Sequence, residues 1–438
     1  MSKYSIKNVH ARRVWDSRGR PTVEAEVTLR YGVQGRAIAP AGASTGSGKV
    51  VERCDGGFQF GGRDVVGAIG AIKSEIAPTL KGMDVREQIE IDRCLIELDG
   101  TENRSPPGGN AIIAMSMAVL HAAAAAEKLP LWQYLGPFQG NSDAETLPLP
   151  EIQIFSGGAH AARRVDVQDF MVIAIGASSY VQALEWTAEV YRHVGISMAE
   201  SGRLHGVPDE GGLWLAFDSN EEALETLVRA IEVAGLTPGQ DVAISLDIAA
   251  SQFGQNGHYK LAGDERRMDS DELSGMLVDW IERYPIVSIE DPLAEDDPEG
   301  LTRFTWAVGR RVQVVGDDFL VTNASRVKGA SKQKACNAVL IKPNQAGTIT
   351  ESKVVVDVAR EAGYGTIVST CSGETEDATI MHLGVGWGIA QLKVGSFSRS
   401  ECMVKWNEGL RIAEAISDLS DHLPPDGNLP PKSAFPWG

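Results

Sequence analysis

The chain has 438 residues, of which 43% are hydrophobic and 23% charged, and its 41 basic and 59 acidic side chains give a net charge of −18 at pH 7. These proportions are typical of a globular protein and exclude a disordered, collagen-like or coiled-coil chain. The length is sufficient for two or three domains that bury their cores without disulfides or a structural metal. The acidic balance argues against a nucleic-acid partner, because a polyanion would be repelled.

The cysteines and the N-terminus indicate the cellular compartment. Five cysteines are far apart and none belongs to a CxxC pair: Cys54, Cys94, Cys336, Cys371 and Cys402. This spacing predicts reduced thiols and neither a disulfide framework nor a zinc site. The first residues lack the apolar stretch of a signal peptide, and no run of 18 apolar residues predicts a membrane segment. We therefore expect a cytoplasmic protein that does not bind membranes.

Residues 1–140 are predicted to form a small α+β domain. The segment 22–29 alternates hydrophobic and polar residues, which is typical of an antiparallel strand with one buried face. Helical patterns follow over 65–80 and 110–127, and strands followed by helices are typical of α+β domains. The glycine-rich, polar residues 136–143 are interpreted as a linker.

Residues 141–422 are predicted to form an α/β barrel. Short apolar runs alternate with helical patterns there, as expected of parallel strands buried on both faces. The runs recur mostly at intervals of about 25 residues, roughly one strand and one helix, and strand ends meet at one mouth of a barrel. The polar residues that close these runs are Asp247, Glu290, Asp317, Lys342, Ser369 and Lys393. A doubly wound open sheet is the alternative, and it would spread these residues along an edge. The proline-rich residues 423–438 predict an extended, loosely held tail.

Three carboxylates in this set suggest a cation site. Asp247, Glu290 and Asp317 offer hard oxygen ligands, which suit Mg²⁺ and are poor for zinc. Any one of them could instead cap a helix or pair with an arginine, but three at matching strand ends favour a metal site.

Two lysines beside that site suggest acid–base chemistry. Lys342 and Lys393 would have lowered pKa values near a divalent cation, which would make a usable general base, although either could serve only as an ion-pair partner. Such a set can make the hydrogen α to a metal-bound carboxylate removable. Glu210, in the glycine-flanked segment 208–212, is a candidate for the acid that expels a β leaving group.

The chain resembles the enolase family from about residue 5 to 415. The stretches that carry the resemblance are Asp16-Ser17-Arg18-Gly19, Gly42-Ala43-Ser44-Thr45-Gly46, Asp99-Gly100-Thr101-Glu102-Asn103, Asp209-Glu210-Gly211-Gly212, Ser288-Ile289-Glu290-Asp291, Val315-Gly316-Asp317-Asp318, Ile341-Lys342 with Asn344-Gln345, and Ser372-Gly373-Glu374-Thr375-Glu376-Asp377. The resemblance implies a small α+β cap on a modified eight-stranded barrel. It also implies Mg²⁺ as cofactor, a small phosphorylated or phosphonate carboxylic acid as substrate, and a homodimer or higher homo-oligomer.

The resemblance also implies roles for individual residues. Asp247, Glu290 and Asp317 would bind the principal Mg²⁺. The residues it places in catalysis are Lys342, the base that takes the α-proton, Glu210, the acid of the elimination, and Lys393, His160 and Asp169. The residues it places against the substrate are Ser372, which should face the phosphate, and Thr370, Cys371, Gln168 and Arg164.

Some of these positions depart from the family pattern. Ala41 replaces a serine that serves a second Mg²⁺, Asp169 is one methylene shorter than the family's glutamate, and Thr370 and Cys371 stand in place of histidine and arginine. A bidentate arginine–phosphate contact is strong and geometrically specific, and a neutral cysteine cannot replace it. Arg164 also departs from the pattern, and it or its neighbour in sequence could supply a compensating charge.

We therefore expect a specialised paralogue that removes the α-proton of a phosphoglycerate-like substrate. A carboxyphosphonoenolpyruvate synthase of phosphonate natural-product biosynthesis is one such relative. The alternatives are a housekeeping phosphopyruvate hydratase, which converts 2-phosphoglycerate to phosphoenolpyruvate and water, and a non-catalytic enolase-like binding protein.

Overall fold

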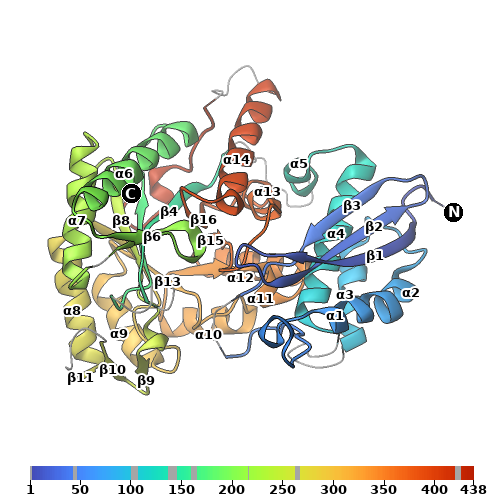
Figure 1. Cartoon of the computed structure of the whole chain (residues 1–438), viewed down its shortest axis with the longest axis horizontal. Coiled ribbons are helices and arrows are strands. Elements are labelled where there is room, and N and C mark those ends of the chain that lie inside the picture. The colour runs from blue at the N-terminus through green and yellow to red at the C-terminus, as the bar shows by residue number, and fades with distance from the viewer. Residues whose placement is uncertain are drawn as a thin grey trace.

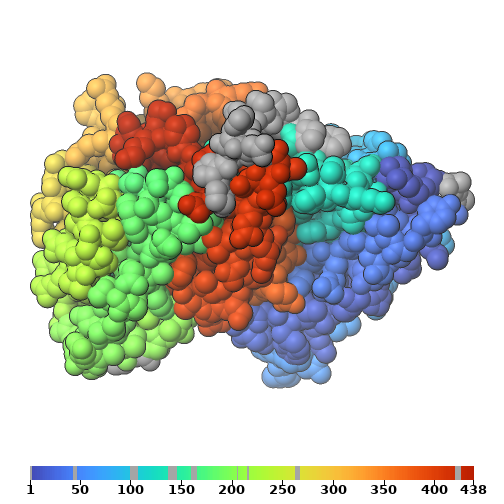
Figure 2. Space-filling view, turned by 90° about the horizontal axis from the view of Figure 1, so that it is seen from above, coloured from blue at the N-terminus to red at the C-terminus, as the bar shows by residue number. Residues whose placement is uncertain are grey.

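The computed structural model describes residues 2–42, 47–99, 107–136, 146–158, 165–215, 217–261, 267–419 and 426–438. Figure 1 shows a three-stranded sheet with its helices at one end of the molecule and a barrel at the other. In the space-filling view of Figure 2, the red segments near the C-terminus lie between the green part of the barrel and the blue N-terminal part.

The N-terminal part is an antiparallel sheet with a long helix packed on it. Strands β1 (Ile6–Trp15), β2 (Pro21–Leu29) and β3 (Gln34–Ile38) pair in that order, and helix α4 (Gly109–Glu127) lies against β2 and β3. A Cβ at Gly35 would lie 2.0 Å from the backbone nitrogen of Ala122, so the helix and the sheet are in backbone contact. The remaining helices of this part are α1 (Val66–Ala71), α2 (Ala77–Leu80), α3 (Gln88–Asp99) and α5 (Leu131–Leu135).

Two expectations for this part need correction or refinement. Strand β2 is buried along most of its length, not on one face only, because it is the central strand and Arg12 and Arg36 cover its polar face through ion pairs to Glu24. Helix α4 is long and apolar enough to cross a membrane by length and composition alone. However, 83% of that window is buried inside the protein, so we interpret α4 as a core helix.

The second part is a closed barrel, which confirms the barrel and excludes the open sheet. Its eight strands, all within described residues, are β4 (Leu149–Ser156), β5 (Asp169–Ile173), β8 (Ala243–Asp247), β12 (Ile286–Glu290), β13 (Gln313–Gly316), β14 (Ala338–Ile341), β15 (Gly365–Ser369) and β16 (Gln391–Ser396). Strand β16 pairs with β4 and closes the ring. Strand β5 runs antiparallel to both neighbours, β4 and β8, and the other barrel pairings are parallel.

Helices connect and surround these strands. They are α6 (Tyr180–Glu200), α7 (Asn220–Val233), α8 (Ser270–Arg283), α9 (Pro298–Val308), α10 (Ala324–Gln333), α11 (Pro343–Ala346), α12 (Ile349–Glu361), α13 (Thr379–Gly386) and α14 (Ser400–Leu419). Several begin at side chains that accept hydrogen bonds from the first turn, for example Ser179, Asp269 and Thr348, as N-cap residues do. Short strands β6 (Leu204–Gly206) and β7 (Leu213–Leu215) extend the sheet beyond β4, and β9 (Gly254–Gln255), β10 (His258–Lys260) and β11 (Arg267–Asp269) form a separate small sheet.

A buried carboxylate joins the two parts. Asp92, on α3, accepts hydrogen bonds from the hydroxyl of Ser116 on α4 and from the backbone N–H of Thr350 in the first turn of α12, at 2.7 and 3.0 Å. A charged acceptor at a helix N-terminus satisfies backbone donors that the helix leaves open. This contact fixes the N-terminal part against the barrel.

The expectation of a loosely held tail is wrong for its described residues. Phe435 is buried against Leu149 and Ile173 and stacks on Trp437 with ring centroids 4.7 Å apart. The tail also makes backbone hydrogen bonds, such as that from the N–H of Tyr180 to the carbonyl of Gly427 at 2.8 Å. Proline prevents regular secondary structure in this segment but does not prevent its aromatic residues from packing.

Candidate active site

A cavity of about 340 Å³ lies at the mouth of the barrel, where the parallel strands end. The N-terminal part contributes Gly42, Lys49 and Glu52 to its wall. The predicted residues that line it are Gln168, Asp169, Glu210, Asp247, Asp317, Lys342, Thr370, Cys371, Ser372 and Lys393. The structure therefore brings together residues that are separated by more than 200 positions in sequence, although it does not test their individual roles.

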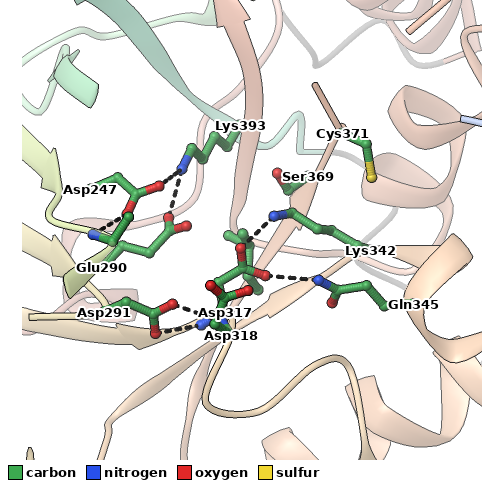
Figure 3. A network of polar contacts seen from close by, with 12 residues as sticks. Asp247, Glu290, Asp291, Asp317, Asp318, Lys342, Gln345, Ser369, Cys371 and Lys393 are labelled. Carbon is green, nitrogen blue, oxygen red and sulfur yellow. Dashed lines mark hydrogen bonds and ion pairs between the residues drawn. The ribbon is translucent and has the colours of Figure 1, made fainter. Parts of the chain in front are cut away.

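Lys393, on β16, lies between two of the predicted metal ligands. Its Nζ is 2.8 Å from Oε2 of Glu290 and 3.2 Å from Oδ2 of Asp247 (Figure 3). It is also 3.7 Å from Oδ2 of Asp169. Glu290 does not line the cavity but reaches it through this ion pair. Gln168 donates to the same Asp247 oxygen at 2.9 Å, so Asp247 is held from two sides.

Lys342, at the end of β14, forms a second ion pair. Its Nζ is 2.5 Å from Oδ2 of Asp317, and Gln345 donates to Oδ1 of the same carboxylate at 3.1 Å (Figure 3). Gln345 is itself fixed by the hydroxyl of Thr322 at 2.8 Å, and that hydroxyl also accepts the backbone N–H of Lys342. Helix α11 begins directly after Lys342, and this turn returns Gln345 to the site.

The carboxylates fit a divalent cation. Oxygens of Asp291, Asp317 and Asp318 lie within 4.8 Å of one another, and they form the one such group that we find among the described residues. Oε1 of Glu290 is buried and has no hydrogen-bond partner in the described chain. A set of carboxylate oxygens without thiolate or imidazole suits Mg²⁺. Asp317 belongs to this group, whereas Asp247 and Glu290 are gathered around Lys393, so the three predicted ligands remain a prediction.

The pKa values of the two lysines differ from the expectation. Burial is the largest single effect and lowers the pKa of Lys342, but the charge of Asp317, together with Cys371 and Glu290, outweighs it, so the pKa lies above its usual value. Burial also acts most strongly to lower the pKa of Lys393, but Asp247 and Glu290, with Asp169 and Glu151, together raise it well above normal. The predicted lowering assumed a bound divalent cation and stays a prediction, because without the cation each ammonium faces carboxylates that raise its pKa.

The pKa values of two carboxyl groups, Glu290 and Asp317, are shifted in opposite directions. Burial, followed by the charge of Asp247, raises the pKa of Glu290 well above its usual value. Burial also acts to raise the pKa of Asp317, but Lys342 overcomes it and the net shift is downward. The site thus holds one carboxyl that favours its proton beside another that favours its charge.

The predicted acid of the elimination lies on a tight turn. Glu210 has a left-handed backbone, φ 68°, inside the short 3₁₀ turn Asp209–Gly211. The carbonyl of Gly211 accepts a hydrogen bond from the hydroxyl of Ser398 at 2.7 Å. Asp169, at the start of β5, is 1% exposed and receives a hydrogen bond from the carboxamide of Gln153.

The residues expected to face the phosphate carry no charge. The thiol of Cys371 donates to Oδ1 of Asn344 at 3.0 Å, and burial raises its pKa to about 12, although Lys342 opposes the shift. Cys371 is therefore a neutral thiol and not a reactive thiolate. Thr370 and Ser372 offer hydroxyls, and Ala41, whose backbone pairs with Gly373, has no side-chain oxygen for a metal.

Two predicted residues, His160 and Arg164, lie outside the described residues. Among the site contacts that sequence reasoning missed are those of Gln345 with Asp317, of Gln153 with Asp169, and of Glu52, which accepts the backbone N–H of Gly42 at 2.7 Å. A signal existed for Gln345, which follows Lys342 by three residues across a proline. Nothing in the local pattern of Gln153 or Glu52 distinguishes them from ordinary polar residues.

Comparisons with known proteins agree with this architecture. Residues 6–135 match the family model of the enolase N-terminal domain, and residues 144–424 match that of the enolase C-terminal TIM barrel domain. The chain is 46% identical over 419 residues to Enolase 1 of Desulfitobacterium hafniense (strain Y51), which covers 95% of each chain.

Proposed function

The chain belongs to the enolase family, and on that premise we propose that it is a Mg²⁺-dependent lyase that converts 2-phosphoglycerate to phosphoenolpyruvate and water. The observation that carries the proposal is the pair of lysines at strand ends, Lys342 and Lys393, each ion-paired to carboxylates in one cavity. The sequence favoured a specialised paralogue, but the identity to Enolase 1 over 95% of both chains supports this alternative better.

Asp247, Glu290 and Asp317 would hold Mg²⁺, with Asp291 and Asp318 adjacent to Asp317. When bound, Mg²⁺ would supply positive charge that stabilises the dianion left after the α-proton is removed. Enolase-type enzymes depend on this metal, and the fit of the carboxylate set supports the same dependence here.

The lysines would act on the substrate's carboxylate end. The carboxylate charge that raises the pKa of Lys342 would be offset by Mg²⁺ held by Asp317, so that Lys342 Nζ could reach its neutral form. In that form it would take the proton from the carbon α to the substrate carboxylate, and the electron pair of that C–H bond would pass into the conjugated carboxylate. Lys393 keeps its ammonium and pairs with the substrate carboxylate, which favours the developing charge. The stem of each lysine is fixed by its strand, so both ammonium groups approach from defined directions.

Carboxyl groups on the other side of the cavity from Lys342 would complete the elimination. Glu210 gives a proton to the β-hydroxyl as the carbon–oxygen bond breaks, so that the leaving group departs as water. Asp169 lies near Lys393 and would help to orient that hydroxyl. The left-handed turn at Glu210 projects the carboxyl into the cavity without support from a helix.

The test is formation of phosphoenolpyruvate from 2-phosphoglycerate with Mg²⁺, together with exchange of the α-proton in deuterated water. Lys342→Met should abolish both reactions, whereas Glu210→Gln should slow the elimination and retain exchange. Lys332→Met, at an exposed lysine on α10, is the matched control. Absence of both reactions in the parent chain would contradict the proposal.

A second candidate is favoured by one observation, the neutral Cys371 where the family has an arginine. A paralogue with a different phosphorus-containing substrate, such as a phosphonate, would need a different anion contact, and Lys49 is a further cation in the cavity wall. Loss of a charged contact worth about 1.5–3 kcal/mol would lower activity on 2-phosphoglycerate by about ten- to hundredfold. Under this candidate, Cys371→Arg raises that activity, and under the first it does not.

Assembly and location are carried over from the family. We expect a homodimer or higher homo-oligomer in the cytoplasm, which sedimentation of the purified protein and cell fractionation would test. The lysines and carboxylates gathered at the mouth of the barrel, with the similarity to Enolase 1, favour an enzyme over a non-catalytic binding protein.

A further inference from the structure

Gln153 connects two parts of the cavity wall, Asp169 and the turn that carries Glu210. It lies on β4, is 1% exposed, and is not among the described residues that line the cavity. Its carboxamide donates to Oδ1 of Asp169 and accepts the backbone N–H of Gly212 at 3.1 Å. A single side chain thus connects the Asp169 carboxylate to the turn that carries Glu210.

The orientation of this amide follows from its partners. A backbone N–H can only donate, so the oxygen of Gln153 must face Gly212, and the NH₂ group then faces the carboxylate of Asp169. Both contacts are satisfied by glutamine alone. A glutamate would place two carboxylates together, and an asparagine would be shorter by about 1.5 Å, one carbon–carbon bond.

The turn after Glu210 is packed tightly against Gln153. A Cβ at Gly212 would lie 2.4 Å from Oγ of Ser156 and 2.8 Å from Oε1 of Gln153, so only glycine fits there. The hydroxyl of Ser398 holds the carbonyl of Gly211 from the other side. The hydroxyl of Tyr191 donates to the same Gly211 carbonyl at 3.2 Å. The backbone that follows Glu210 is therefore fixed at consecutive residues, and Gln153 provides the contact at Gly212.

We propose that Gln153 is a positioning residue that sets the separation between the Asp169 carboxylate and the Glu210 turn. Asp169 is one methylene shorter than the family's glutamate, and Gln153 reaches across to hold it. The role of these two carboxylates rests on the proposed function. The two hydrogen bonds of Gln153, with Asp169 and with Gly212, are called the clamp below and do not depend on that function. The pair needs a fixed total length, so one methylene moved from Gln153 to Asp169 should preserve the span.

The first experiment is a double-mutant cycle with Gln153→Asn, Asp169→Glu and the combined variant. Misplaced reacting groups can cost about 10²-fold, so each single change should lower kcat by that order while KM stays close to the parent value. The combined variant should return to within about threefold of the parent, because coupled residues are not additive. A combined variant no better than the worse single change would overturn the proposal.

The second experiment needs no substrate. Hydrogen–deuterium exchange of the full chain should show about tenfold faster exchange in the peptide that contains Gly212 for Gln153→Asn, and parent-like exchange for the combined variant. Gln313→Asn, a buried glutamine bonded to Gln391 away from the cavity, is the matched control and should leave that peptide unchanged. Unchanged exchange in Gln153→Asn would overturn the clamp. If the parent fails to act on 2-phosphoglycerate, the proposed function fails while this experiment still decides the role of Gln153.

Discussion

Replacement of Lys393 by methionine should destabilise the metal-free protein and increase its response to Mg²⁺. Methionine keeps much of the apolar stem but removes an ammonium that lies 2.8 Å from Glu290 and 3.2 Å from Asp247. Both carboxylates are then left buried without their cation. Removing one partner of a buried ion pair costs about 3–5 kcal/mol.

The lower part of that range is expected, because a proton can replace part of the lost charge. Burial and Asp247 already raise the pKa of Glu290 well above 4.5, and loss of Lys393 raises it further. A carboxyl with a raised pKa in the folded state binds its proton more tightly than in the unfolded state, so stability falls as pH rises through the interval between the two values. The deficit of Lys393→Met should therefore shrink as the pH is lowered from neutrality towards about 4.5.

The assay is urea unfolding followed by tryptophan fluorescence, in EDTA and in Mg²⁺. A ligand of the folded state at about 100 times its Kd stabilises by about 2.7 kcal/mol, and the gain should be larger in Lys393→Met, in which the carboxylates have no competing ammonium. Lys332→Met, at an exposed residue, is the control. Equal free energies of unfolding for the parent and Lys393→Met in EDTA would refute the reasoning.

Three further predictions concern pH, thiol chemistry and packing. The hydrogen bond from His382, with Arg411, lowers the pKa of Glu408 to about 2. The stability that this carboxylate contributes is fully present above its unfolded-state pKa of about 4.5 and is lost as the pH falls towards 2. Glu408→Gln should therefore reduce the loss of stability at acid pH, as measured by urea unfolding. Cys371, with its pKa of about 12, should react with iodoacetamide at neutral pH far more slowly than the exposed Cys54, as judged by mass spectrometry. Phe435→Ala should lower the free energy of unfolding by about 3 kcal/mol, because it removes a buried aromatic ring.

Each of these has a result that would contradict it. Glu414→Gln, at an exposed glutamate of the same helix as Glu408, should leave the loss of stability at acid pH unchanged. An equal effect of Glu408→Gln and Glu414→Gln would contradict a specific contribution of the His382–Glu408 contact. Alkylation of Cys371 at the rate of Cys54 would contradict the neutral thiol. Trp306→Ala, at a residue that is 86% exposed, should have little effect, and a similarly small effect of Phe435→Ala would mean that the tail is loosely held after all.

The sequence predicted the barrel from polar residues that directly follow short apolar runs. This criterion found the strands that are mostly hydrophobic. It did not find β4 or β5. Strand β4 contains Glu151 and Gln153, which interrupt the apolar run yet are buried, because Ser245 hydrogen-bonds Glu151 and Gly212 hydrogen-bonds Gln153. Strand β5 runs antiparallel and presents Asp169 at its first residue, so a rule based on strand ends could not place it.

Within the site, residue types were predictable but their pairing was not. Spacing along the chain placed Lys342 and Lys393 at the mouth, but the ion pair of Lys342 with Asp317 and the contact of Lys393 with Glu290 depend on the twist and radius of the closed sheet. The same limit applies to the lysine pKa values, because the sequence indicated a neighbouring cation but did not show that carboxylates surround each ammonium.

The pairing of β16 with β4 has a consequence for how the protein is made. These strands are more than half of the chain apart, so ring closure waits until nearly all of the chain has left the ribosome, and such long-range pairing is slow. Until then the stretch 149–153 of β4 lacks its partner on one edge, because β7 pairs only with Phe155 and Ser156. An open strand edge is a template for aggregation. Lys393 arrives on that closing strand, between Asp247 and Glu290. Completion of the barrel and completion of its charged centre are therefore one late folding event, and a nascent chain stalled before β16 should be both inactive and prone to associate with its own copies.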